Sequence, residues 1–142
     1  MDATYRAIGC FITHFSGVEE VMRDYLALKV GLALQDYNAV ITHDFALLCT
    51  AVEEVFGRTL DAQNKKHLRG LISRARELNI QRVKVVHGQW WPDHEGGTLW
   101  HISRQNLRAK VSGKMAISLN HQTELARELM VQMRVFFEQE CP

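Results

Sequence analysis

Apolar residues recur at alternating steps of three and four along the start of the chain, which is the spacing of one face of a helix. The stripe predicts a helix over residues 4–30 and consists of Ile8, Phe11, Ile12, Phe15, Val18, Met22, Tyr25 and Leu26. Gly9 and Gly17 lie inside this helix, where a glycine costs up to about 1 kcal/mol relative to alanine. We therefore expect both glycines to lie at a close contact with another helix.

Three further helices are predicted from the same spacing. The second spans residues 42–56, with Thr42 as its N-cap, Asp44 in its first turn and Gly57 at its end. Its apolar residues are Phe45, Leu48, Val52 and Val55. The last spans residues 120–138, with Asn120 as its N-cap. Its core-facing residues are expected to be Leu125, Leu129, Met133 and Phe136.

The third helix is predicted over residues 61–87. Its stripe consists of Leu68, Leu71, Ile72, Ala75, Leu78, Val83 and Val86, with arginine and lysine on the other faces. The spacing slips by one residue near Leu78-Asn79-Ile80, which predicts a kink or a break there. His87-Gly88 reads as the end of the helix.

Residues 88–119 have a different pattern. Gly96-Gly97 separates two runs of strand-favouring side chains, residues 89–91 and 98–103, which predicts a β-hairpin or an extended loop. Residues 104–118 show no strong period and are expected to be partly mobile. The fold class is thus all-α, an up-and-down four-helix bundle with a small β-hairpin or extended insertion before the last helix. Residues 1–142 are expected to form one domain.

Composition and cysteine usage favour a cytoplasmic globular protein. The 142 residues are 46% apolar and 23% charged, as in ordinary folded domains. Cys10, Cys49 and Cys141 are far apart in sequence and form no CxxC pair, which favours a reducing compartment. The first residues lack a signal-peptide pattern, and no stretch is apolar enough to span a bilayer. We expect the chain to be neither exported nor membrane-spanning.

Charge is distributed unevenly along the chain. Residues 58–114 hold 12 Lys/Arg and 4 Asp/Glu, a net charge of +8, whereas residues 1–57 carry −5 and residues 115–142 carry −2. Such a segment suits an anionic partner such as RNA. Neutralisation by the acidic flanks within one fold explains the same distribution equally well.

Arg82 and His87, at the end of the third predicted helix, are the candidate catalytic residues. A neutral imidazole accepts a proton from a ribose 2′-OH near pH 7, and a guanidinium stabilises charge on the phosphate in the transition state. On an ideal helix the two positions are about 140° apart. A purely structural alternative is an ion pair of Arg82 with Glu20 or Glu54, with His87 capping the last carbonyl groups.

This pair resembles the mark of the HEPN superfamily (higher eukaryotes and prokaryotes nucleotide-binding), an arginine followed four to six residues later by a histidine on a helix of an all-α bundle. The resemblance extends to the long first helix with residues 17–20 and to the run over residues 79–88. It implies a homodimer whose two Arg/His pairs share a cleft and cut RNA without metal, leaving a cyclic phosphate. Some members are toxins or defence effectors, with a cognate antitoxin or nucleotidyltransferase as partner.

One position departs from the family pattern. The residue after the arginine is usually polar in active members, often asparagine, whereas this chain has Val83. Members without activity bind ligands or serve as interaction modules, so the alternative is a non-catalytic dimer that binds a partner protein, nucleotide or RNA. A basic RNA-binding module without catalysis is a third reading.

Further residues around the pair are candidates for substrate binding, namely Asn79, Lys84, Trp90 and Arg104. Tryptophans interleaved with cations are typical of surfaces where bases stack and phosphates are neutralised, as here with Trp90, Trp91, Trp100, Arg104, Arg108, Lys110 and Lys114. The alternative is that the tryptophans anchor a hairpin on the bundle or bury a dimer face. For Lys84 the solvated side chain of an ordinary helix lysine is the favoured reading over a phosphate contact.

Metal and cofactor chemistry are not expected. His87, His94 and His101 are spaced by seven residues, and the intervening Pro92, Gly96 and Gly97 exclude one continuous helix that would hold all three. The phosphate-binding patterns GxxxxGK[ST] and GxGxxG and the nucleophile elbow GxSxG are absent from the sequence.

Overall fold

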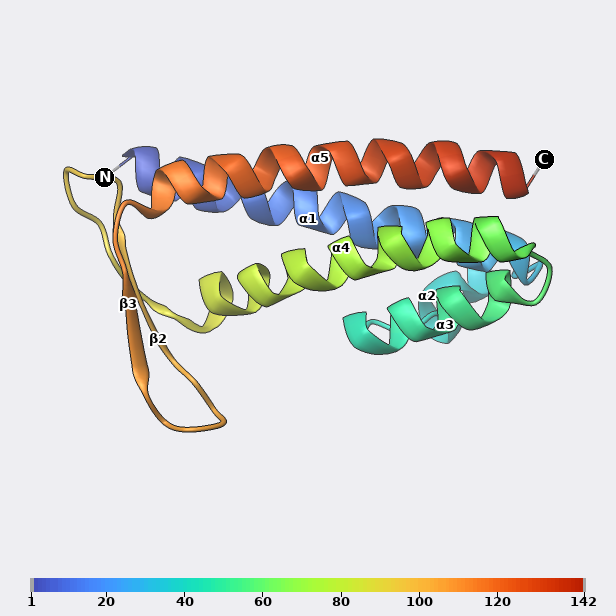
Figure 1. Ribbon diagram of the computed structural model, residues 1–142, viewed down its shortest axis with the longest axis horizontal. Helices are drawn as coiled ribbons and strands as arrows, with labels where there is room; N and C mark the ends of the chain where they lie inside the picture. Colours follow the sequence, from blue (N-terminus) through green and yellow to red (C-terminus); the bar gives the residue numbers. More distant parts are fainter. Residues whose placement is uncertain (1, 142) are drawn as a thin grey trace.

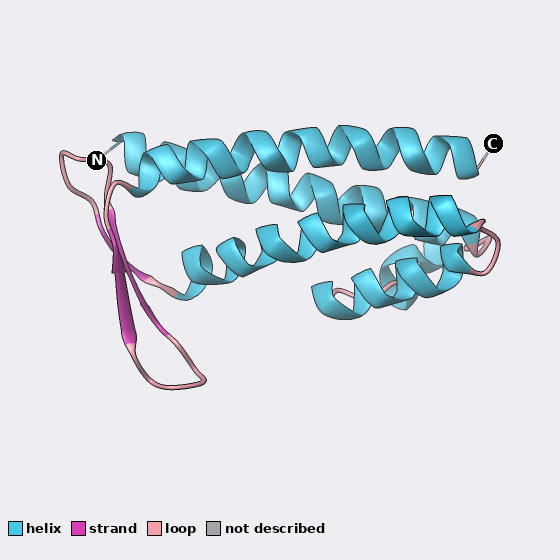
Figure 2. Ribbon diagram, in the orientation of Figure 1, coloured by secondary structure: helices cyan, strands magenta, loops and turns pink. Residues whose placement is uncertain are grey.

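The computed structural model describes residues 2–141, most of which are helical (Figures 1 and 2). In chain order the elements are α1 (Asp2–Lys29), the 3₁₀ turn η1 (Leu34–Asp36), α2 (Tyr37–Val40), α3 (Phe45–Gly57), α4 (Ala62–His87), β1 (Gln89–Trp91), β2 (Thr98–Ile102), β3 (Ala109–Ser112) and α5 (Met115–Glu140). The predicted combination of a mostly helical fold with a small β insertion before the last helix is confirmed. The insertion is a three-stranded antiparallel sheet rather than a hairpin.

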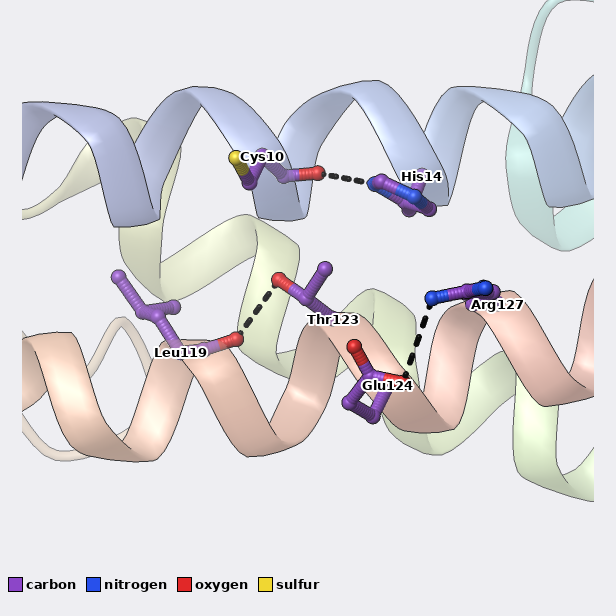
Figure 3. A network of polar contacts seen from close by, with 6 residues as sticks. All are labelled: Cys10, His14, Leu119, Thr123, Glu124 and Arg127. Atoms are coloured by element: carbon purple, nitrogen blue, oxygen red, sulfur yellow. Dashed lines mark hydrogen bonds and ion pairs between the residues drawn. The ribbon is translucent and has the colours of Figure 1, made fainter.

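Helices α1 and α5 run side by side and in the same direction for nearly their whole length, and α3 and α4 pack below them (Figure 1). The predicted up-and-down order is therefore wrong, because it requires the first and last helices of the bundle to be antiparallel. The core between the helices is apolar and continuous from Ala7 near one end to Phe137 near the other. Polar contacts along this pair include bonds that stay within one helix, such as Thr123 Oγ1 donating to the Leu119 carbonyl at 2.8 Å (Figure 3). The pairing of α1 with α5 therefore depends mainly on apolar burial.

Gly17 lies at a close contact between α1 and α5. A Cβ at this position would lie 2.8 Å from the Met130 sulfur, so the predicted close helix contact is confirmed here. The same prediction is wrong for Gly9, which is exposed and has open space where its Cβ would be.

Helix α3 begins three residues later than predicted. The N-cap is Asp44, whose carboxylate accepts a hydrogen bond from the Leu47 amide at 2.7 Å. Thr42, the predicted cap, instead accepts from the Asp44 amide at 3.1 Å and stabilises the turn before the helix. The end of the helix near Gly57 is as predicted.

Helix α4 is continuous, so the predicted kink or break near Leu78 is wrong. Its buried side runs through Ala75, Leu78 and Val85, at steps of three and seven, and Arg82 occupies the intermediate step. The slip in the apolar pattern thus arises because an arginine occupies a core-facing position. Val86, predicted to face the core, is exposed, and Val83 is half-buried.

Helix α5 begins at Met115, five residues before the predicted start. Lys114 precedes it in a left-handed conformation with φ 53°, and Asn120 is an exposed residue inside the helix. Leu129, Met133 and Phe136 are buried as predicted, whereas the prediction is wrong for Leu125, which is 39% exposed. The segment expected to be irregular, residues 104–118, contains β3 and the first turn of α5.

The sheet is attached to the helices at two glycine contacts. A Cβ on Gly88 would collide with the Leu99 side chain, which is buried against the end of α4. Gly97, at φ +90°, lies against Thr4 of α1, and its carbonyl accepts from the Met115 amide at 3.1 Å. Strand β2 is therefore fixed to α1, α4 and the start of α5. Between residues 2 and 141, no helix is long and apolar enough to cross a membrane.

The aromatic cluster at the end of the helices opposite the sheet tests this packing. Phe137 is fully buried, with ring centroids 4.8 Å from Phe56 and 5.3 Å from Tyr25. We expect Phe137→Ala to lower the free energy of unfolding by about 3–5 kcal/mol, because it leaves a cavity in the core. Val131→Ala, on the same helix but 54% exposed, is the control and should change it by less than about 0.5 kcal/mol. Equal losses in urea denaturation of the two variants would contradict this packing.

Candidate functional site

The guanidinium of Arg82 is held in place by its own helix and by α1. Its Nε and Nη2 both donate to Asn79 Oδ1, at 3.2 and 3.0 Å. Its Cζ lies 5.5 Å from the centroid of the Phe15 ring, within cation–π range. The side chain is half-buried, and none of the hydrogen bonds found over residues 2–141 uses its Nη1. Arg82 is thus a positioned cation with part of its donor capacity unused.

The carboxylate associated with Arg82 is Glu19 of α1. Partial burial raises the pKa of the Glu19 carboxyl, and the neighbouring Arg82, Arg23 and His43 oppose that shift. The carboxylates considered from the sequence are placed differently, since Glu20 is exposed and Glu54 pairs with Arg58 at 3.4 Å. No ion pair within 4 Å joins Arg82 to any carboxylate of the described chain.

His87 is exposed at the last turn of α4 and lines an open pocket of about 610 Å³. The pocket lies between the end of α4 and strand β2 with the residues that follow it. Its other lining residues are Val83, Gln89, Trp100, His101, Ile102, Ser103 and Arg104. Two imidazoles, one guanidinium and one indole thus share a single solvent-open site, a composition suited to a phosphate next to a base.

Arg82 and His87 have different surroundings within one chain. The five-residue offset places them about 140° apart around α4 and about 7.5 Å apart along it. Arg82 packs on Phe15 of α1, whereas His87 lines the pocket beside the sheet, which Arg82 does not line. A site that uses both groups on one phosphate therefore needs side-chain rearrangement or a second subunit.

The four candidate substrate-binding residues are divided among separate environments. Arg104 lines the pocket with His87, whereas Lys84 lines a smaller one, of about 290 Å³, with His101 and Lys110. Asn79 accepts both hydrogen bonds from Arg82, so it orients that side chain.

Trp90 is fixed to the helices. Its Nε1 donates to the Val85 carbonyl at 2.8 Å, and its half-buried ring packs against the core. This is the anchoring role considered as an alternative for the tryptophans. Trp91 and Trp100 have the opposite environment, being 63% and 45% exposed. Successive side chains of a strand point to opposite faces, so Trp90 and Trp91 must have different environments. Which of the two faces the helices depends on the strand register, which the sequence does not give.

Cysteine and metal chemistry receive no support from the geometry. Burial raises the pKa of the Cys49 thiol to about 11, so its nucleophilic thiolate is scarce near neutral pH. All three cysteines are free thiols. Over residues 2–141, no group of three His, Cys, Asp or Glu side chains is close enough together to hold a metal ion.

No protein-family model, curated protein sequence or solved structure matches this chain. The inference of function therefore depends on the residues and their geometry.

The environment of Glu19 predicts a pH-dependent effect on stability. Because the folded-state pKa of Glu19 is raised, ionising this carboxyl destabilises the fold as pH rises above its ordinary value of 4.5. We expect Glu19→Gln to gain stability relative to the wild type on going from pH 4 to pH 7, measured by urea denaturation at both values. Glu20→Gln, next to it and exposed, is the control and should show no such gain. A difference between Glu19→Gln and wild type that is the same at both pH values would contradict the assignment.

Proposed function

We propose that this chain is a HEPN-type protein whose helical bundle consists of α1, α3, α4 and α5, with α4 running opposite to the other three (Figure 1). Its proposed activity is that of a metal-independent endoribonuclease acting as a homodimer, in the manner of a toxin or defence effector. The observation that carries the proposal is the exposed His87 in an open pocket shared with Arg104, five residues from a positioned arginine.

In the proposed reaction, the imidazole of His87 takes the proton from a ribose 2′-OH. The resulting oxygen attacks the adjacent phosphorus, and the bond from phosphorus to the 5′-oxygen breaks. The 5′-oxygen leaves with a proton taken from solvent, the imidazolium returns its proton to solvent, and the other product ends in a 2′,3′-cyclic phosphate. No electron acceptor or metal is needed, because only the phosphoryl bond and two protons move.

Arg82 is proposed to stabilise the negative charge that develops on the phosphate oxygens. Its two bonds to Asn79 and its contact with Phe15 reduce the freedom of a long side chain, which lowers the entropic cost of holding it in place. Arg82 and His87 of one chain face different surroundings, and the proposed dimer would bring an arginine and a histidine from two chains to one cleft.

A second candidate function is supported by the same arginine. Arg82 lies half-buried beside Phe15 and Glu19 and follows the apolar Leu78 in the core-facing stripe, while Val83 stands where active HEPN proteins usually have a polar residue. In that case Arg82 holds α4 to α1, and the chain is a non-catalytic dimer that binds a partner protein, nucleotide or RNA.

Cleavage of a structured RNA in the presence of EDTA separates the two candidates. We expect the wild type to produce cyclic-phosphate ends, and His87→Ala and Arg82→Ala each to lower the rate by at least about 100-fold. His94→Ala and Arg69→Ala are the controls, since both side chains are exposed and lie outside the pocket of His87.

Folding of each variant is checked by circular dichroism. Cleavage that persists in both His87→Ala and Arg82→Ala, or that is absent from a folded wild type, would rule out the ribonuclease and favour the binding protein.

A further inference from the structure

The face of the three-stranded sheet that points away from the helices is formed by exposed side chains. In the antiparallel register Trp100 lies opposite Gln89 and Val111, and Trp91 lies opposite Thr98. Residues directly opposite each other share a face, as do alternate residues of one strand. One face therefore carries Gln89, Trp91, Thr98, Trp100, Ile102, Ala109 and Val111, of which Thr98 alone is half-buried and the rest are exposed.

The opposite face of the sheet packs on the helices, and this orientation leaves these side chains in solvent. Leu99 is buried against α4, and Trp90 is held by the Val85 carbonyl, so the face that carries both is directed at the helices. Trp91 and Trp100 are diagonal neighbours across the β1–β2 pair, a separation of about 7–8 Å. Two indole rings thus stand next to each other on a surface that the described residues leave uncovered.

Positive charge is concentrated on the β2–β3 side of this apolar face. Between Gly96 and Thr123 the chain has no aspartate or glutamate, while it has the cations Arg104, Arg108, Lys110 and Lys114. Arg104 and Arg108 lie in the β2–β3 connection, which extends beyond the helices at the end of the molecule where the sheet sits (Figure 1). A polyanion that lies along β2 and β3 therefore meets these cations. The carboxylates nearest the face are in the β1–β2 connection, where Asp93 accepts a hydrogen bond from the Thr98 hydroxyl at 2.9 Å and Glu95 is exposed.

The exposed face is continuous with the pocket of His87. Trp100 belongs to the outward face and also lines that pocket, and Arg104, two residues after β2, lines it as well. A base stacked on Trp100 would place its neighbouring phosphates near Arg104 and His87.

We propose that the outward face of the sheet is a stacking platform for single-stranded RNA, with Trp91 and Trp100 each receiving one base and Arg104 and Arg108 neutralising phosphates. Indole rings stack on any unpaired base, so the platform tolerates different sequences. The bases of a duplex are paired and stacked on each other, so a duplex cannot use it. The inference rests on the proposed function in taking RNA as the ligand, and it adds the strandedness of the substrate and the residues that hold it.

The test is fluorescence anisotropy with a labelled single-stranded oligoribonucleotide of mixed sequence, in a His87→Ala background so that no cleavage occurs. We expect Trp91→Ala and Trp100→Ala each to weaken binding about tenfold, and Trp91→Phe and Trp100→Phe to retain most of it. Ile117→Ala, at an exposed apolar position on α5, is the matched control and should leave binding unchanged. Arg104→Ala with Arg108→Ala should lower the slope of log affinity against log salt by about 1.4, the value for two phosphate contacts on a single strand.

Three results would overturn the platform: wild-type affinity in Trp91→Ala with Trp100→Ala, equal binding of the same RNA as a duplex, or loss of a dimer in sedimentation equilibrium when the two tryptophans are replaced. The last would show that the face is an interface between two copies. A chain that binds through the tryptophans but never cuts RNA would retain the platform and lose the ribonuclease. If the wild type cuts RNA and the tryptophan variants bind it with unchanged affinity, the ribonuclease proposal is retained and the platform is ruled out.

Discussion

Burial of apolar surface between α1 and α5 is the interaction on which the rest of this structure depends. The two helices come from opposite ends of the sequence, and they contact each other along nearly their whole length (Figure 1). Because they run in the same direction, the start of α1 and the start of α5 lie at the same end of the molecule (Figure 1). The sheet is held at that end, because Gly97 lies against Thr4 and bonds to Met115.

The position of the sheet in turn determines the surroundings of His87. Since β1 follows α4 after the single residue Gly88, the strand starts where the helix ends, and the Leu99 side chain is buried at that junction. An open pocket remains beside this contact, between the last turn of α4 and the residues around Trp100 and Arg104. A histidine at a helix end thus shares a site with residues that are distant in sequence.

The same packing sets Arg82 apart from His87. Helical periodicity places Arg82 on the side of α4 that faces α1, where Phe15 and Asn79 hold it, and turns His87 toward solvent. A half-buried guanidinium beside a partly buried carboxyl is costly unless the groups around it compensate, which is why the contacts of Arg82 bear on both stability and chemistry. In the catalytic role proposed for Arg82 its remaining donors bind a phosphate, whereas in the structural role the residue only holds α4 to α1.

The helices can be predicted from the chain alone, because apolar residues at steps of three and four are a local property. The sequence located α1, α3 and α4 to within about three residues at each end and identified Arg82, His87 and Arg104 as candidates for chemistry. It missed the first turn of α5, where Lys114 provides no ordinary cap, and it read the slip at Arg82 as a break in the helix. Which candidate residues share one pocket or one face depends on the tertiary structure. Strand register separated the anchored Trp90 from the exposed Trp91 and Trp100, and packing placed His87 and Arg104 in one pocket, because both depend on contacts between residues far apart in sequence.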